Sequence, residues 1–400
     1  MAPAMRTHVL IIHKPVIKGS FSCKIRSGKF EINKNYNFIE RHQMSRIYHT
    51  VLTQIRSGSR IVLATVVHTA GSTPQKPGSS AVFNENGLLA GTVGGGMLER
   101  EIQHIAESVL ISGQSDHFYF NLDNEPGGEG PICGGEAVVL VDAEPSVHLE
   151  VLENMEQNLA RRMEGFLLTA VSRKHDQGRT IRRHWISSDR MNDFPEDTDP
   201  VFKKLVKNHI SKAVRFGFVE IDLTSLPGHP VKKAYLEHVH PLPKLVIAGG
   251  GHVGRALAHL GFLLEFEVTV VDDRPEFVSA DHIPDADHRV VGDAGEVLSG
   301  LKPGADTFIV IATRGHSHDG EALRACIGSD AAYIGMIGSK RKVEHMKKQF
   351  LDEGWATPEQ WSSVFAPVGL PLGSKTIQEI AISIAAQLVE VLNREKGTDE

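Results

Sequence analysis

The spacing of hydrophobic and polar positions predicts a mixed α+β domain over residues 44–145. Apolar residues at helical spacing predict a helix at 47–55, and a β-branched run at 60–71 predicts a buried strand that ends at a glycine. Two apolar stretches joined by Asn-Glu-Asn-Gly predict a hairpin. A one-sided apolar pattern predicts a helix at 97–110, and a last strand is expected at 134–145.

The pattern changes twice further along the chain. Residues 146–240 alternate between helix and strand patterns with polar loops, which predicts an intermediate α+β segment without an evident catalytic constellation. The sequence "HPLPK" at 240–244 is typical of a linker. From residue 244 to 392 the order is strand, glycine-rich turn, helix and strand, as in a parallel α/β domain, and residues 393–400 form a tail.

The glycine-rich turn "GGGHVG" carries a G-x-G-x-x-G pattern at Gly249, Gly251 and Gly254. In a Rossmann-type fold the first glycine allows a tight turn, the second admits a phosphate, and the third lets the helix pack on the strand. Asp272 and Asp273 end the next predicted strand, where a carboxylate would accept hydrogen bonds from ribose hydroxyls. The pattern predicts the fold and leaves open whether an intact dinucleotide binds.

Two later loops fall where strands of this sheet should end. "TRGHSHD" contains Arg314, His316, His318 and Asp319, and it can be a polar loop with a helix cap, a ligand contact or a metal site, although no third separated metal ligand is evident. Gly338, Ser339 and Lys340 precede a predicted helix, where a hydroxyl and a positive charge suit either an anion or an ordinary cap.

The near-Walker sequence "GSKT" lacks the required glycine spacing and lysine position, so a nucleotide-hydrolysing loop is rejected. Thr376 and Glu379 instead predict a capping box at the start of an apolar-faced helix.

Composition narrows the function classes. A net charge of −6 disfavours a general nucleic-acid binder, and 41% hydrophobic with 23% charged residues is ordinary for a globular protein. Three scattered cysteines favour a reducing, cytoplasmic setting, and no apolar run approaches the roughly 18 residues of a membrane helix. Residues 1–43 are basic and aperiodic, which predicts a disordered leader, a start assigned too early, or a targeting or partner-binding arm.

From residue 44 to about 392 the chain resembles the XdhC/CoxI family, the accessory proteins of xanthine dehydrogenase and related molybdenum hydroxylases. The motifs that carry the resemblance occur in family order: "GSTPQKPGSSAVF", "GTVGGGMLERE", "ICGGEAVVLVD", "HVHPLPKLVIAGGGHVGRALA", "TRGHSHD", "YIGMIGSKRK" and "APVGLPLGSKTIQEIAISIAAQLV". Residues 1–43 lie outside it, and the middle segment matches only loosely.

The resemblance implies a cofactor chaperone more than a conventional enzyme. Such a protein binds and protects molybdenum cofactor (molybdopterin), supports its sulfuration with a cysteine desulfurase, and delivers it to a xanthine dehydrogenase-type hydroxylase; a homodimer is an option. The candidate cofactor-binding residues are Gly94, Gly95, Gly96, Gly249, Gly251, His252, Gly254, Asp272, Gly338, Ser339 and Lys340.

Cys133 is the candidate metal ligand or sulfur carrier, because it is flanked by glycines in "GPICGGE" and molybdenum favours soft sulfur donors. It can equally be a small buried residue at a strand start, whereas Cys326 is expected in an apolar helix core. Two alternatives remain: an NAD(P)-dependent oxidoreductase with His316 or His318 as proton donor, and a nucleotide-sensing regulatory module.

Overall fold

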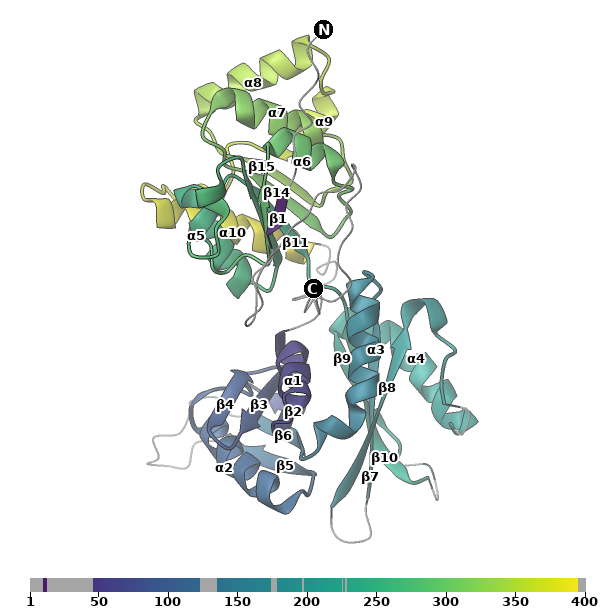
Figure 1. Cartoon of the computed structure of the whole chain (residues 1–400). Helices are drawn as coiled ribbons and strands as arrows, with labels where there is room; N and C mark the ends of the chain where they lie inside the picture. Colours follow the sequence, from purple (N-terminus) through teal and green to yellow (C-terminus); the bar gives the residue numbers. More distant parts are fainter. Residues whose placement is uncertain are drawn as a thin grey trace, which may run out of the picture. The chain divides into compact units, whose positions relative to one another are not determined.

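The computed structural model describes residues 10–12, 46–122, 135–173, 178–195, 198–224, 226 and 229–394. The chain divides into two units: residues 42–241 form one, and residues 1–41 with 242–400 form the other. We call them the N-terminal unit and the Rossmann unit. Figure 1 labels their elements. None of the described helices is both long and apolar enough to cross a bilayer.

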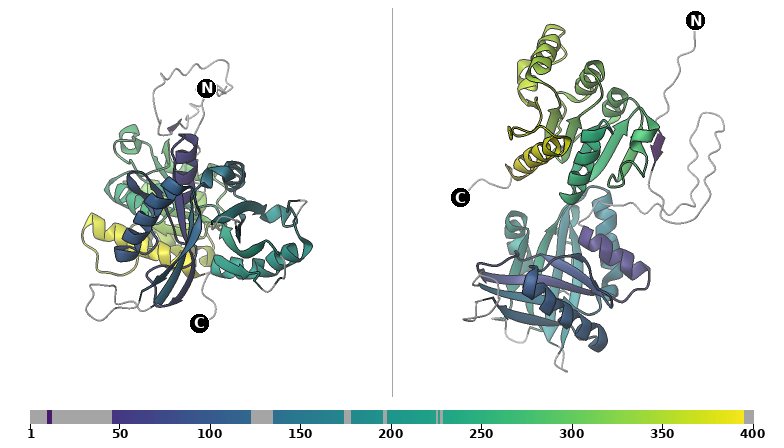
Figure 2. Two further views of the ribbon diagram at one scale, coloured as in Figure 1. Left: turned by 90° about the horizontal axis from the view of Figure 1, so that it is seen from below. Right: turned by 90° about the vertical axis from the view of Figure 1, so that its left-hand side faces the viewer.

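The Rossmann unit is built on a sheet whose six parallel strands run in the order β13-β12-β11-β14-β15-β16. This is the 3-2-1-4-5-6 order of a dinucleotide-binding fold, so the predicted fold class is confirmed. The strands are β11 (Lys244–Ala248), β12 (Glu267–Asp272), β13 (His288–Val291), β14 (Thr307–Ile311), β15 (Tyr333–Met336) and β16 (Val364–Phe365). A short strand, β1 (Leu10–Ile12), pairs antiparallel with β13 at the sheet edge (Figure 2, right).

Helices cover both faces of this sheet because its strands are apolar on both sides. One face packs against α5 (His252–Leu263) and α10 (Ile377–Arg394), and the other against α6 (Ala294–Gly300), α7 (His316–Cys326) and α8 (Lys340–Asp352), as Figure 1 shows. The short helix α9 (Pro358–Ser362) and the 3₁₀ turn η3 (Pro275–Val278) complete the unit. The predicted capping box is confirmed, since Glu379 N donates to Thr376 Oγ1 and Thr376 N donates to Glu379 Oε2.

The N-terminal unit contains two antiparallel sheets. The five-stranded sheet has the order β4-β3-β2-β6-β5, and the predicted hairpin is confirmed between β3 and β4. Its strands are β2 (Val62–Gly71), β3 (Ser80–Asn84), β4 (Gly87–Gly91), β5 (Asp116–Asn121) and β6 (Gly135–Asp142). Helix α2 (Gly96–Ser112) buries its apolar stripe against one face of this sheet.

The second sheet of this unit has the order β8-β7-β10-β9 and consists of β7 (Gly165–Arg173), β8 (Arg179–Ser187), β9 (Phe218–Asp222) and β10 (Val231–Val239). Apolar residues of both sheets share one cluster, so the sheets pack against each other. Helix α4 (Pro200–Phe216) covers the second sheet, while α1 (Arg46–Arg56) and α3 (Leu149–Ala160) share a further cluster with both sheets. Two 3₁₀ turns, η1 (Pro145–His148) and η2 (Ser188–Arg190), connect elements.

Candidate functional site

The glycines of the Rossmann loop differ in what the backbone requires of them. Gly249 has φ +122°, and a Cβ there would lie 2.2 Å from the Ala312 carbonyl oxygen. A Cβ on Gly254 would lie 1.9 Å from the carbonyl oxygen of Gly249. Gly251 has φ −65°, and a Cβ there would have no heavy atom within 4 Å. The fold therefore explains Gly249 and Gly254, whereas Gly251 leaves open space in front of α5.

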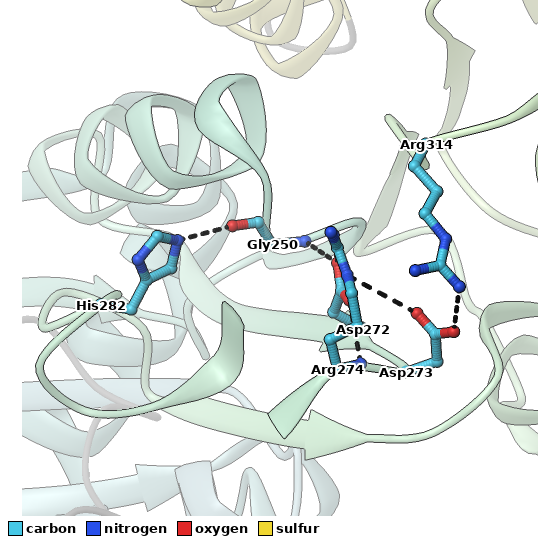
Figure 3. A network of polar contacts seen from close by, with 6 residues as sticks. All are labelled: Gly250, Asp272, Asp273, Arg274, His282 and Arg314. Atoms are coloured by element: carbon cyan, nitrogen blue, oxygen red, sulfur yellow. Dashed lines mark hydrogen bonds and ion pairs between the residues drawn. The ribbon is translucent and has the colours of Figure 1, made fainter. Parts of the chain in front are cut away.

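Asp272 ties this loop to the end of β12 (Figure 3). Its Oδ2 accepts from Gly250 N at 2.9 Å, and Arg274 binds both carboxylate oxygens through Nε and Nη2 at 2.8 and 2.9 Å. Arg274 N donates a fourth hydrogen bond, to Oδ1, at 3.1 Å. Burial tends to raise the pKa of Asp272, but the hydrogen bonds from Arg274 and Gly250 outweigh it and lower the pKa.

Four donors fill the acceptor capacity of the Asp272 carboxylate. A ribose hydroxyl could therefore bind there only by displacing one of them. The neighbouring Asp273 pairs with Arg314 at 2.6 Å (Figure 3). The guanidinium of Arg274 lies 3.6 Å from the centre of the Phe277 ring. The end of β12 thus presents two guanidinium groups beside two carboxylates. Arg274 directly follows the two aspartates but was not predicted as a site residue.

The "TRGHSHD" loop is held by its aspartate. Asp319 is fully buried and accepts from Thr313 N at 3.1 Å and from Thr313 Oγ1 at 2.5 Å. Lys342, on α8, forms an ion pair with the same carboxylate. Asp319 therefore joins the loops after β14 and β15, and its contacts are structural.

The lysines of the "GSKRK" sequence lie in two different environments. Ser339 is the N-cap of α8 and accepts from Lys342 N at 3.3 Å, so the cap interpretation is realised. Lys342 reaches Asp319, whereas Lys340 is exposed at the first position of the helix. His252 is likewise exposed, at the first position of α5.

The segments that follow β11, β12, β13 and β14 line a small cavity of about 20 Å³ at the carboxyl ends of the strands, which we call the crevice. Its lining residues include Gly249, Asp272, Asp273, Arg274, Asp293, Arg314 and His318. The structure thus brings Gly249, Asp272 and His318 together, as their places after successive strands predicted.

The earlier glycine run, Gly94 to Gly96, has positive φ throughout, at +140°, +65° and +56°. A Cβ on Gly94 would lie 2.8 Å from Pro74, but one on Gly95 or Gly96 would meet no heavy atom within 4 Å. Thr92 holds the run, because its hydroxyl accepts from Gly94 N at 3.1 Å and donates to Glu99 Oε2 at 2.8 Å. The loop exposes glycine backbone at the start of α2, which has no side-chain cap.

Motifs that are distant in sequence meet at this end of the five-stranded sheet. Gly71, which opens "GSTPQKPGSS", pairs with Gly135 at the start of β6. A Cβ on Gly135 would lie 2.6 Å from the Ser72 carbonyl oxygen, and Pro74 packs beside Gly94. Cys133 lies outside the described residues, two positions before Gly135 in the sequence.

The N-terminal unit contains a group of buried ionisable side chains that was not predicted from the sequence. Tyr48 donates to Glu237, and Arg183 pairs with Asp142, with both partners of that pair almost wholly buried. Burial raises the pKa of Glu237 to about 7, although the Tyr48 hydrogen bond and the charge of Arg183 act to lower it. Burial, with Arg183 nearby, lowers the pKa of His148 to about 4. The two residues of each pair come from separate elements, so no local sequence motif predicts these pairs.

The N-terminal unit also has a cleft of about 360 Å³ with a cationic lining. Its polar lining residues include His117, Tyr119, Arg173, Arg179, Lys232 and Lys233. Burial and the charges of Arg179 and Lys233 lower the pKa of His117 to about 4, so it is neutral at pH 7. Its Nε2 lies 2.8 Å from the Tyr235 hydroxyl. Arg179 and Lys233 pair with Asp116 and Glu220, so the positive charge of this lining is partly compensated.

Two family descriptions match the chain where these loops lie. The XdhC Rossmann domain matches residues 245–388, and the XdhC and CoxI family matches residues 54–121. The chain belongs to the XdhC/CoxI family. The two matches contain the crevice and the glycine run at Gly94 to Gly96, respectively.

Relatives of this XdhC/CoxI protein differ in how much of the chain they share. The "Uncharacterized protein YqeB" of Escherichia coli (strain K12) is 35% identical over 156 residues, which are 39% of this chain and 28% of that relative. A protein of Bacillus subtilis (strain 168) that is named as a probable xanthine dehydrogenase component is 24% identical over 352 residues, covering 87% of this chain and 98% of the relative.

A crystal structure of a protein described as a xanthine dehydrogenase from Bacillus halodurans has the same fold. It superimposes with a TM-score of 0.67 at 23% identity and covers 88% of this chain and 98% of that one.

Proposed function

We propose that this XdhC/CoxI protein is an accessory protein of a xanthine dehydrogenase-type molybdenum hydroxylase. It binds molybdenum cofactor, protects it, supports its sulfuration together with a cysteine desulfurase, and delivers it to the hydroxylase. The observation that carries the proposal is the presence of both family regions in one chain, with the name of the Bacillus subtilis relative as further support.

The residues present fit the chemical groups of this cofactor. Molybdopterin carries a terminal phosphate, and phosphates bind to backbone N–H groups at helix N-termini where no side chain intervenes. Gly251 in front of α5 and Gly95 and Gly96 at the start of α2 meet that requirement, because the space around them is open. Arg314 lies at the crevice edge, and although its guanidinium pairs with Asp273, it has further N–H donors for an anionic group.

The bound cofactor would supply the molybdenum centre, and the chain would hold and shield it. Cys133 is the residue that we propose as a sulfur contact, because a thiolate is a soft ligand and can also carry sulfane sulfur. Ser339 and Lys340, at the start of α8, and His252, at the start of α5, are proposed as further contacts for an anionic group.

An NAD(P)-dependent oxidoreductase is the alternative, and the strand order of the Rossmann unit favours it. The saturated carboxylate of Asp272 argues against the usual ribose contact. Titration of the purified chain under anaerobic conditions with isolated molybdenum cofactor, NAD and NADP separates the two functions. We expect molybdenum cofactor to bind with micromolar or tighter affinity. If cofactor binding is undetectable while NAD binds tightly, the proposal of a cofactor carrier is refuted and the oxidoreductase takes its place.

A substitution at Gly251 tests where the cofactor binds. Gly251→Val places a side chain in the open space before α5 without a forbidden φ, so the fold should persist while affinity falls at least about tenfold, or roughly 1.4 kcal/mol. Gly300→Val is the matched control, since Gly300 also has open space but ends α6. Equal cofactor affinity in both folded variants would mean that the Rossmann loop is only structural.

A further inference from the structure

Three side chains beside the crevice converge on one point. One ligand atom from each of Asp293, His318 and Glu321 lies within 4.8 Å of the other two. We propose that these residues bind a divalent first-row transition-metal ion, which is distinct from molybdenum and independent of the function proposed above.

Local structure brings the three residues together. Asp293 is the N-cap of α6, and its Oδ1 accepts from Glu296 N at 3.0 Å, which leaves its other oxygen available. His318 and Glu321 are three positions apart on α7 and therefore share one face of that helix. Gly295 permits the close approach of the two helices, because a Cβ there would lie 3.2 Å from Asp293 Oδ1 and 3.3 Å from Glu321 Cβ.

Two of the three side chains are available for a metal ion. Among the residues that the structure describes, neither His318 nor Glu321 has a hydrogen-bond or ion-pair partner. Nitrogen and oxygen ligands lie about 2.0–2.2 Å from a divalent ion such as zinc, so ligands of one ion are at most about 4.4 Å apart. Small side-chain rotations from the present positions suffice.

The ligand types select the ion. One imidazole and two carboxylates suit a borderline or hard transition ion such as Mn²⁺, Fe²⁺ or Zn²⁺, whereas Mg²⁺ prefers oxygen ligands alone. Asp293 and His318 also line the crevice with Gly249 and Arg314. Remaining coordination positions could therefore accept an oxygen of an anionic ligand bound in the crevice. The site could not be predicted from the sequence, because Asp293 is 25 residues before His318 and is separated from it by α6 and β14.

Titration of the full chain with MnCl₂, followed by electron paramagnetic resonance of the free ion, tests the site. Manganese is chosen because a soft thiolate competes poorly for it. Two variants remove one ligand each: Asp293→Asn, which keeps a good N-cap residue, and His318→Gln. The control is His104→Gln, because His104 and Glu107 repeat the His-x-x-Glu spacing on α2 without a third ligand among the described residues.

We expect one Mn²⁺ per chain, a loss of affinity of about tenfold or more in each ligand variant, and no change in the control variant. Circular dichroism should show all variants folded. Absence of Mn²⁺ binding to the unsubstituted chain, or equal affinity in His318→Gln or Asp293→Asn and in the control, would overturn the site.

Discussion

Replacing Glu237 with glutamine should change how the stability of the N-terminal unit depends on pH. Glu237 lines an internal cavity of about 10 Å³ together with Tyr48 and Arg183, and burial raises its pKa to about 7. An unfolded glutamate titrates near 4.3. Between these two values the unfolded chain has released the proton that the folded chain still holds, so the free energy of unfolding falls as pH rises through this window.

The size of this effect follows from the shift in pKa. A displacement from the ordinary glutamate value to about 7 corresponds to at most about 4 kcal/mol. Glu237 keeps some exposure to solvent, which screens its charge, so we expect about 1–3 kcal/mol. Glutamine has the shape of the neutral acid and can still accept the Tyr48 hydrogen bond. As pH rises from 5 to 8, the unsubstituted chain should therefore lose unfolding free energy that the Glu237→Gln variant keeps.

Hydrogen–deuterium exchange of peptides from β10, corrected for the intrinsic rate at each pH, measures the unfolding free energy of this unit alone. Glu150→Gln is the control, because Glu150 is exposed on α3 and its loss should not change the profile. Parallel pH profiles for Glu237→Gln and the unsubstituted chain would refute the assignment of a raised pKa to Glu237.

Two further predictions concern buried groups. Asp142→Ala leaves the charge of Arg183 buried without its partner, so urea denaturation should show a loss of about 3–5 kcal/mol, whereas a loss below 1 kcal/mol would mean that the pair is solvated. Burial raises the pKa of Cys326 to about 12, so a thiol reagent should label Cys133 faster than Cys326 in the native chain. Cys326→Ser should cost about 1 kcal/mol in thermal denaturation, because serine can still donate to the Ala322 carbonyl oxygen as the thiol does; equal labelling of both thiols would contradict this account.

Local patterns predicted much of this fold because their causes are local. The capping box at Thr376 and Glu379, the hairpin between β3 and β4, and the burial of Cys326 each depend on residues within a few positions of one another. The strand order of the Rossmann unit follows from its βαβ repeats, since crossover connections leave few arrangements for consecutive parallel strands.

Side-chain partners could not be predicted in the same way. Tyr48 and Glu237 are 189 residues apart, and Arg183 and Asp142 lie on strands of different sheets. Asp272 was identified from its place at the end of β12, but the sequence did not show that Arg274 would occupy both of its oxygens. Such pairings depend on how sheets and loops pack, which hydrophobic periodicity does not specify.

The glycine run at Gly94 to Gly96 and the Rossmann loop at Gly251 support a ligand contact to different degrees. At Gly95 and Gly96 a positive φ already favours glycine, so the residue type there follows from the turn into α2 whether or not a ligand approaches. Gly251 has an ordinary φ and no neighbour that a Cβ would meet. The fold does not explain glycine at that position, and close approach of a ligand to the backbone before α5 is the physical reason that remains. A substitution at Gly251 is consequently the more informative test of the two runs, because its effect on binding is not mixed with backbone strain.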